Sequence, residues 1–364
     1  MEAANTSQRT RAALARVEAM QPVILGDDRH RSHDPPFEIN AGQHVAPVWE
    51  QPARIDAIAG ALRAAGYRIA APEPCDDAVL TTVHDPAMVE FARHGHAQWV
   101  AAGGPEVMIP DTFPTPAALR SGRCPSAALG AAGWWCADTA TPIVAGTYAA
   151  ARAGVDLAVT GADLLLGGTE AVYALSRPPG HHAGTDFYGG FCLFNQAAIA
   201  ARRLSEHGPV AVLDLDVHHG NGTQDIFWRD GQVLLVSLHA DTNHLYPFFT
   251  GSVEERGEGP GHGATHNLPL PAGTTDDAYL RVLHTAAEVV HDHDPLAVVV
   301  SLGFDTSSAD PIGSLALSAG AYPRIGRVLR DLRRPLLLIQ EGGYAIDRLG
   351  DHATAVLDGL TEPT

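Results

Sequence analysis

The chain has 364 residues, 45% of them hydrophobic and 18% charged, which is the balance of a globular protein and excludes a disordered one. Its formal net charge is −18 and it contains no lysine, so its surface repels phosphate backbones and offers no basic stripe for nucleic acid. No apolar run reaches the ~18 residues of a membrane span, and the N-terminus lacks the apolar core of a signal peptide. We therefore expect a cytoplasmic protein that binds neither nucleic acid nor a membrane.

Two segments differ in composition from the rest of the chain. Residues 1–20 form a polar tail, and we expect residues 21–364 to fold as one domain. Residues 99–147 are rich in Gly, Pro, Ala and Thr and contain Trp134 and Trp135. Two interpretations stay open for them: an excursion that covers the sheet or meets another subunit, and a surface loop with a small aromatic cluster. The four cysteines form no C-x-x-C pair, so neither a disulfide framework nor a cysteine–zinc site is expected.

From about Val155 onward, short apolar runs alternate with segments of helical periodicity. The apolar runs, which predict buried strands, are 171–176, 210–217, 233–240, 296–305 and 335–340. The segments with helical spacing are 195–208, 276–292 and 321–334. This alternation predicts an α/β fold with a parallel sheet that is covered by helices on both faces.

Unusual polar residues follow four of these predicted strands. RPPGHH follows the run 171–176, and VLDLDVHHGNGTQ begins within the run 210–217. The run 296–305 ends in Asp305, and EGGY follows the run 335–340. In open parallel sheets, ligands bind outside the carboxyl ends of the strands. We therefore expect imidazole, carboxylate and phenol groups from distant parts of the chain to meet at one edge.

The stretch VLDLDVHHGNGTQ predicts a metal site. Side chains alternate along a strand, so Asp214, Asp216 and His218 should share one face. One buried aspartate could be a satisfied structural group, but two on one face repel each other unless a cation or hydrogen-bond donors intervene. Asp216 and His218 with the distant Asp305 would form three protein ligands and leave a position open for water.

The pair His181–His182 and the residue Tyr344 each allow two interpretations. The histidines are either loop residues bonded to backbone or a general base and acid beside the metal. Tyr344 is either a turn aromatic or a donor to a developing oxyanion. A structural role is expected for the other histidines considered, which are His94, His96, His219, His291 and His293, while His30 and His33 could line a pocket mouth.

Four motifs, RPPGHHAGTDFYGGFCLFN, VLDLDVHHGNGTQDIF, SLGFDTSSADP and EGGY, resemble those of the zinc-dependent deacetylases of the arginase/deacetylase superfamily. Their order and spacing resemble most those of acetylpolyamine amidohydrolases and bacterial class II histone deacetylase-like amidohydrolases. The resemblance spans about residues 24–360. It implies one domain with a mainly parallel sheet of about eight strands.

The resemblance also implies roles for individual residues. Asp216, His218 and Asp305 match the zinc ligands, and the same set would accept Fe²⁺ or Co²⁺. His182 would take a proton from water, His181 would stay cationic, and Tyr344 would stabilise the oxyanion. Asp214 would orient His181, and Asn221, which is usual in the class II and polyamine branches, would lie behind His182. The implied channel residues are Phe191, Tyr246, Ile312, Gly190 and Gly342.

The family resemblance further implies a K⁺ or Na⁺ site. It would use backbone oxygens of Asp214, Asp216, His218 and Leu238 and the hydroxyl of Ser237. The superfamily also contains binuclear manganese enzymes, whose bridging carboxylates would stand at positions 220 and 303. Both positions are glycine here, so a single catalytic metal is expected.

Substrate identity is less constrained than reaction class. Glu38 lies in PPFEINAGQ, which resembles a pocket mouth that would receive a distal ammonium. The segment WWCADTATPIVAG resembles a dimer-forming loop, but its one acidic residue is Asp138, which argues against a long polyamine. We expect an acetylpolyamine, an acetylated diamine or another small acyl amide as substrate, and a homodimer or higher oligomer. The alternatives are a class II protein acetyl-lysine deacetylase and a non-catalytic acyl-ligand binder.

Overall fold

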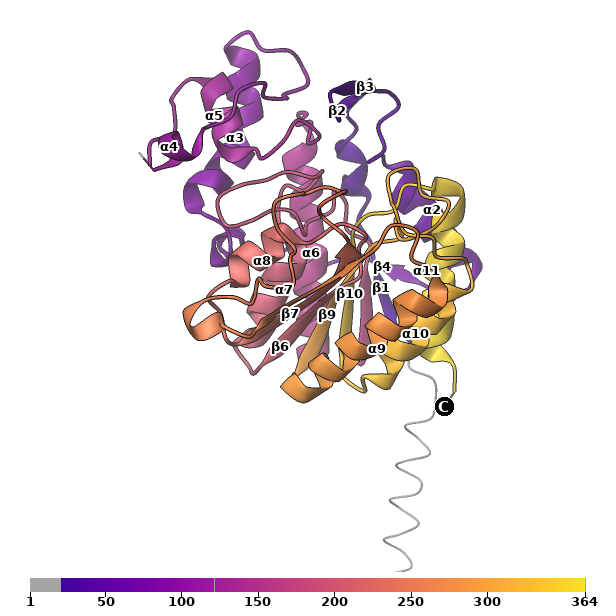
Figure 1. The fold of residues 1–364 in the computed structure, drawn as a ribbon. Helices are drawn as coiled ribbons and strands as arrows, with labels where there is room; N and C mark the ends of the chain where they lie inside the picture. Colours follow the sequence, from indigo (N-terminus) through magenta and orange to yellow (C-terminus); the bar gives the residue numbers. More distant parts are fainter. Residues whose placement is uncertain (1–20, 121, 364) are drawn as a thin grey trace, which may run out of the picture.

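The computed structural model describes residues 21–120 and 122–363, so the predicted tail at residues 1–20 lies outside the described residues. Eight parallel strands form the central sheet in the order β4-β1-β5-β10-β9-β6-β7-β8 (Figure 1). Their bounds are β1 Val23–Leu25, β4 Ile69–Ala70, β5 Ala171–Ala174, β6 Val210–Asp214, β7 Val233–Ala240, β8 Thr265–Leu270, β9 Ala297–Leu302 and β10 Leu336–Gln340. The predicted α/β class and the sheet of about eight strands are confirmed.

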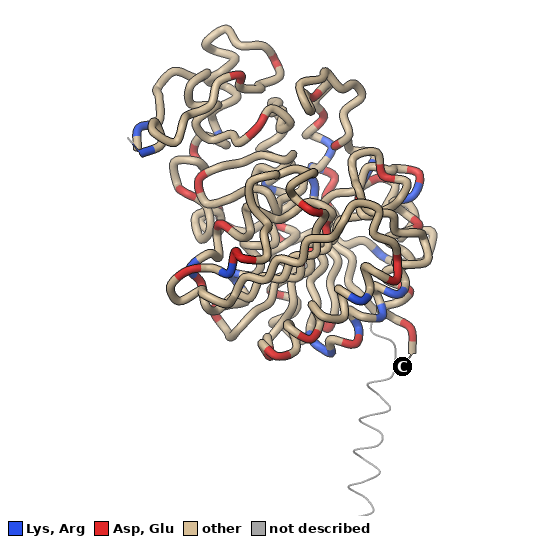
Figure 2. The backbone as a smooth tube through the Cα atoms, in the orientation of Figure 1, with Lys and Arg blue, Asp and Glu red and all other residues tan. Residues whose placement is uncertain are grey.

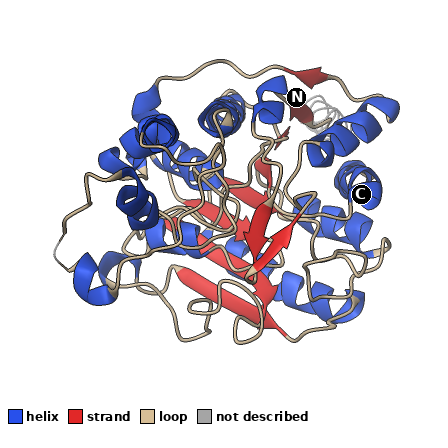
Figure 3. Ribbon diagram, turned by 90° about the horizontal axis from the view of Figure 1, so that it is seen from above, coloured by secondary structure: helices blue, strands red, loops and turns tan. Residues whose placement is uncertain are grey.

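Helices cover both faces of this sheet (Figures 1 and 3). One layer consists of α2 Ala53–Ala64, α9 Asp276–His293, α10 Ala321–Asp331 and α11 Ile346–Thr361; the other is built on α6 Thr147–Leu166 and α7 Gln196–Ser205. The shorter α8 Asn221–Phe227 follows β6. The sequence of β6 is continuously apolar because both of its faces are buried. Ala211 and Leu213 pack in the core under the first layer of helices, and Val210 and Val212 pack in the core under the second.

The excursion at residues 99–147 contains helices in its described part. It begins at the end of α3 Pro86–Ala101 and contains α4 Pro116–Leu119 and α5 Ala128–Trp135. Trp135 is buried in the core beneath α5, while Trp134 is only partly buried and packs edge-on against it. Figure 1 shows this segment and the hairpin of β2 Glu38–Asn40 and β3 Gln43–Val45 above the sheet. Whether the excursion covers the site or meets another subunit stays a prediction.

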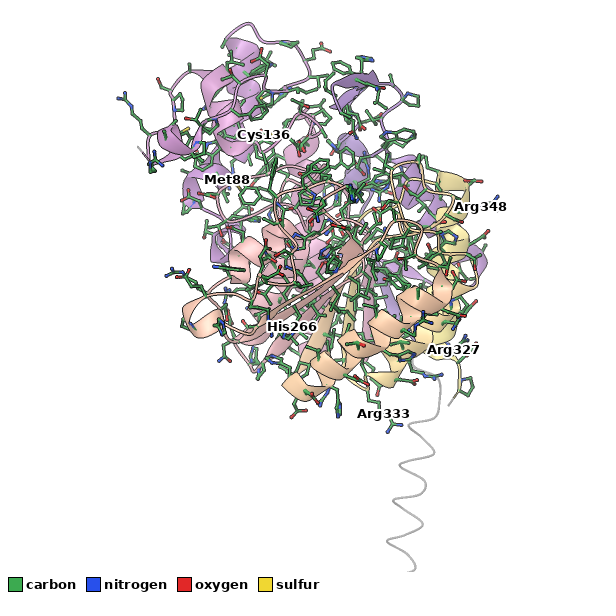
Figure 4. All side chains as sticks on the ribbon, viewed as in Figure 1. Met88, Cys136, His266, Arg327, Arg333 and Arg348 are labelled. Atoms are coloured by element: carbon green, nitrogen blue, oxygen red, sulfur yellow. The ribbon has the colours of Figure 1, made fainter. Side chains whose placement is uncertain are left out.

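Charged side chains lie mostly on the outside of these layers. Figure 2 shows acidic positions spread around the periphery, and Figure 4 shows Arg333 and Arg348 projecting outward from the helical layer of α10 and α11. No helix in the described part of the chain combines the length and the apolar character that crossing a membrane requires.

Candidate active site

The site lies at the carboxyl ends of the four central strands β5, β6, β9 and β10. β6 ends at Asp214, so Asp216 and His218 lie in the loop beyond it and not on the strand face that alternation predicted. They nevertheless meet Asp305, which follows β9. The strand-end rule, and not the alternation of side chains, accounts for this meeting.

Asp216, His218 and Asp305 form a buried cluster with the geometry of a metal site. Their ligand atoms all lie within 4.8 Å of one another. His218 Nδ1 is 3.2 Å from Asp216 Oδ1 and 3.3 Å from Asp305 Oδ2, and the latter oxygen accepts no hydrogen bond within the described structure. Burial and the charge of Asp216 raise the pKa of the Asp305 carboxyl to about 7. A bound cation would offset this repulsion, so the donor set fits a metal.

Backbone amides orient the two carboxylates. Val217 N donates to Asp305 Oδ1 at 2.9 Å, and Gly342 N donates to Asp216 Oδ2 at 2.7 Å. A Cβ at Gly342 would come within 2.1 Å of Asp305 Oδ2 and 2.5 Å of Asp216 Oδ2. Gly342 thus lies behind the metal cluster and does not line the substrate cavity, where the resemblance had placed it.

The two adjacent histidines occupy different electrostatic environments. His181 Nδ1 is 3.0 Å from Asp214 Oδ2; burial disfavours the charged ring, but Asp214 and Asp216 outweigh this and raise the pKa of His181 to about 10. His182 Nδ1 is 2.7 Å from Asn221 Oδ1, and burial together with charged His181 holds the pKa of His182 well below its usual value. One ring therefore carries a proton that the other lacks.

Tyr344 is held on three sides. Its backbone N donates to Asp310 Oδ2 at 2.7 Å, its ring lies 4.7 Å from the guanidinium of Arg54, and Phe191 packs edge-on at 5.6 Å. Burial raises the pKa of the Tyr344 phenol well above 10. The hydroxyl therefore keeps its proton and can serve as a hydrogen-bond donor in the cavity that it lines.

A buried ion cluster that no sequence pattern indicated lies beneath this tyrosine. Arg54, from α2, donates to the backbone oxygens of Glu341 and Gly343 at 2.5 and 2.6 Å and pairs with Glu50 at 2.7 Å. Arg177 donates to the same Glu50 oxygen at 2.8 Å. The cluster clamps the EGGY turn that presents Tyr344. Nothing in the spacing of Glu50 or Arg54 distinguishes them from an ordinary exposed helix pair.

The remaining predicted residues line a cavity of about 440 Å³ or lie near it. Phe191, Tyr246, Ile312 and Gly190 are among its lining residues, together with both active-site histidines, His218 and Tyr344. Glu38 is not: it is buried on the hairpin strand β2, where burial and Glu50 raise its pKa to about 7. Its prediction as a mouth residue is wrong for this structure, because its neighbours Ile39 and Asn40 face the cavity instead. Among the described lining residues, the carboxylate is that of Asp138.

The other histidines considered in the sequence lie away from the cavity, whereas His244, which the sequence did not single out, is among its lining residues. His219 points to the opposite side, with Nδ1 3.0 Å from Thr250 Oγ1 and Nε2 3.1 Å from Gln224 Oε1. His30 and His33 are buried and do not line the cavity; His94 and His96 lie on α3, and His291 and His293 end α9.

The residues of the expected K⁺ or Na⁺ site lie on the neighbouring strands β6 and β7 and in the loop after β6. Asp214 of β6 is paired in register with Ser237 of β7. The Ser237 hydroxyl is 2.8 Å from His239 Nδ1. The cation itself stays a prediction.

Comparison with known proteins agrees with this geometry. The model of the histone deacetylase domain matches residues 48–360. Acetylpolyamine amidohydrolase 1 of Pseudomonas aeruginosa is 39% identical over 92% of this chain and 97% of its own length. A solved structure of acetylpolyamine aminohydrolase from Burkholderia pseudomallei superimposes with a TM-score of 0.88 at 34% identity, covering 93% of this chain and 98% of that one. Histone deacetylase 15 of Arabidopsis thaliana is 33% identical over 94% of this chain but only 57% of its own length.

The family model covers most of the chain, and the relatives named as amidohydrolases align with it nearly end to end. The paired histidines, the Asp-His-Asp cluster and the buried tyrosine all lie within the matched residues. The chain belongs to the histone deacetylase domain family.

Proposed function

We propose that the chain is a metal-dependent amidohydrolase that removes an acetyl or similarly short acyl group from an amine. The observation that carries this is the placement of a neutral and a charged histidine, a protonated tyrosine and an Asp-His-Asp cluster around one cavity. Each group required for amide hydrolysis is present, which argues against a non-catalytic acyl-ligand binder.

We propose Zn²⁺ as the ion at Asp216, His218 and Asp305, with Fe²⁺ or Co²⁺ as acceptable substitutes and K⁺ or Na⁺ near Ser237 and Leu238. When bound, the divalent metal would supply Lewis-acid activation of water and of the substrate carbonyl. Two observations support this assignment: the buried Oδ2 of Asp305 accepts no hydrogen bond within the described structure, and His218 lines the cavity.

The protein groups then divide the proton transfers among them. Neutral His182 accepts the proton of the attacking water at Nε2, because its Nδ1–H donates to Asn221. It later returns that proton to the leaving amine. His181, held charged by Asp214, stabilises negative charge without transferring a proton. The Tyr344 hydroxyl donates to the carbonyl oxygen as charge develops there.

We propose an acetylated polyamine or shorter diamine as substrate. The relatives that match end to end are named for acetylpolyamines, and the cavity volume suits a narrow acyl amine. A class II acetyl-lysine deacetylase is the second candidate, since the plant histone deacetylase matches 94% of this chain.

The deciding experiment is a panel of kcat/KM values on the zinc-loaded enzyme. Acetylputrescine, acetylcadaverine and acetylspermidine should exceed acetyl-lysine peptides by at least about tenfold, which is 1.4 kcal/mol of transition-state discrimination. A preference for the peptides would replace the polyamine proposal with the deacetylase one. No turnover of any member, at full metal content, would favour the binder.

We also propose a cytoplasmic location and a homodimer or higher oligomer. Cell fractionation tests the first, and sedimentation velocity of the purified chain tests the second. A monomer at micromolar concentration would contradict the oligomer.

A further inference from the structure

Asp138 joins three segments of the cavity wall. Its Oδ2 accepts hydrogen bonds from Gly190 N at 2.6 Å and from the Tyr246 hydroxyl at 2.7 Å. Its Oδ1 accepts from Ala140 N at 2.9 Å and from the Thr141 hydroxyl at 3.2 Å. Both oxygens are thus occupied by donors of the protein, so the carboxylate is not free to receive a substrate ammonium.

The groups held by Asp138 lie against the catalytic residues. The Tyr246 ring packs edge-on against His182, with ring centroids 4.9 Å apart. On the other side, Phe191 follows Gly190 and packs against Tyr344. The Phe191 amide donates to the Thr141 hydroxyl at 3.0 Å, and that hydroxyl in turn donates to Asp138. One carboxylate therefore fixes the two aromatic wall residues that the resemblance implied, Phe191 and Tyr246.

The backbone of this wall needs such an anchor. Phe191 has φ +69°, a left-handed conformation that a residue with a bulky side chain rarely adopts, and Gly190 has φ +56°. Such a strained backbone conformation persists only where the surroundings hold it in place. The hydrogen bonds that Gly190 N donates to Asp138 and Phe191 N donates to Thr141 help to hold it, together with the backbone bonds between Gly189 and Cys192.

We propose that Asp138 is a positioning residue that sets the width of the acyl channel and so selects acetyl over longer acyl groups. The proposal rests on the proposed amidohydrolase function. A rigid apolar wall discriminates between substrates that differ by one methylene by ~10–200-fold, whereas a wall that can move away discriminates less. The hydroxyl of Tyr246 and the amide of Gly190 are the means by which Asp138 holds the wall still.

The test compares kcat/KM for acetylputrescine and butyrylputrescine, which differ only in the acyl chain. Tyr246→Phe keeps the ring and removes one bond to Asp138, and Asp138→Ala removes all of them. The acetyl-to-butyryl ratio should fall by about tenfold in Tyr246→Phe, the size of one hydrogen bond to a charged group, and at least as far in Asp138→Ala. In the double variant the ratio should fall no further than in Asp138→Ala, because that change already removes the bond between Asp138 and the Tyr246 hydroxyl.

Asp111→Ala is the matched control, since Asp111 is an exposed carboxylate in the same excursion and does not line the cavity. Its ratio should equal that of the wild type. An unchanged ratio in active Tyr246→Phe overturns the proposal, as does a double variant whose loss is the product of the two single losses. If Asp138→Ala does not fold, Tyr246→Phe decides alone. A wild type that hydrolyses neither substrate contradicts the proposed function instead.

Discussion

Tyr344→Phe isolates the contribution of one hydroxyl group. The substitution keeps the backbone bond to Asp310, the contact of the ring with Arg54 and the packing against Phe191. The ring should therefore stay in place, and the free energy of unfolding should change by less than about 1 kcal/mol. Only the proton donor to the developing oxyanion is removed.

Loss of an oxyanion donor lowers kcat by ~10²–10³, or about 3–4 kcal/mol of transition-state stabilisation. Because this bond strengthens only in the transition state, KM should change little. The assay is steady-state hydrolysis of acetylputrescine, with metal content measured on the same preparations. Since burial holds the pKa of Tyr344 well above 10, the wild-type rate should show no loss from this group as the pH rises to 9.

Tyr148→Phe serves as the control, because Tyr148 lies on α6 and does not line the cavity. Its hydroxyl donates to Asp77 Oδ2 at 3.3 Å. Its kcat should equal that of the wild type. A kcat for Tyr344→Phe within about threefold of the wild-type value would refute the oxyanion role.

Three further predictions concern the metal, pH and the buried ions. Asp305→Asn should lower the bound metal per chain, measured by atomic emission, and full stoichiometry would contradict its role as a ligand. Burial lowers the pKa of His84 to about 4, so between pH 6.5 and 4 the unfolded chain binds a proton that the folded chain does not. The free energy of unfolding should therefore fall by ~3 kcal/mol as the pH falls through this window. In urea titrations of His84→Gln, the free energy of unfolding should depend less on pH over the same range. Glu50→Gln leaves Arg54 and Arg177 buried without their shared carboxylate and should cost ~3–5 kcal/mol, so a loss below 1 kcal/mol in the same titrations would contradict the clamp.

The central elements were predictable because their signals are local. Strands β5, β6, β7, β9 and β10 are buried on both faces and so appear as continuous apolar runs, although the structure ends several of them earlier than the runs do. Strands β1 and β4 have three and two residues, which is too short for any periodicity to show. Strand β8 contains Pro269 in a weakly apolar segment, so the sequence does not mark it as a strand. It is recognised only by its pairing with β7.

The meeting of the polar groups at one edge was likewise predictable from the sequence. Any parallel sheet brings the residues after β5, β6, β9 and β10 to one edge, so His181, Asp216 and Tyr344 could be expected to lie close together, while their roles were implied by the family resemblance. Which strand neighbours which, and hence which groups touch, depends on the order of the sheet.

Only the tertiary structure decided what supports and bounds that site. Arg54 reaches the backbone of Gly343 across 289 positions, and Glu38 turns inward while its neighbours face the cavity. Asp138 joins Gly190 and Tyr246, which lie on separate loops. These contacts depend on long-range packing and side-chain direction, which no local pattern of residues records.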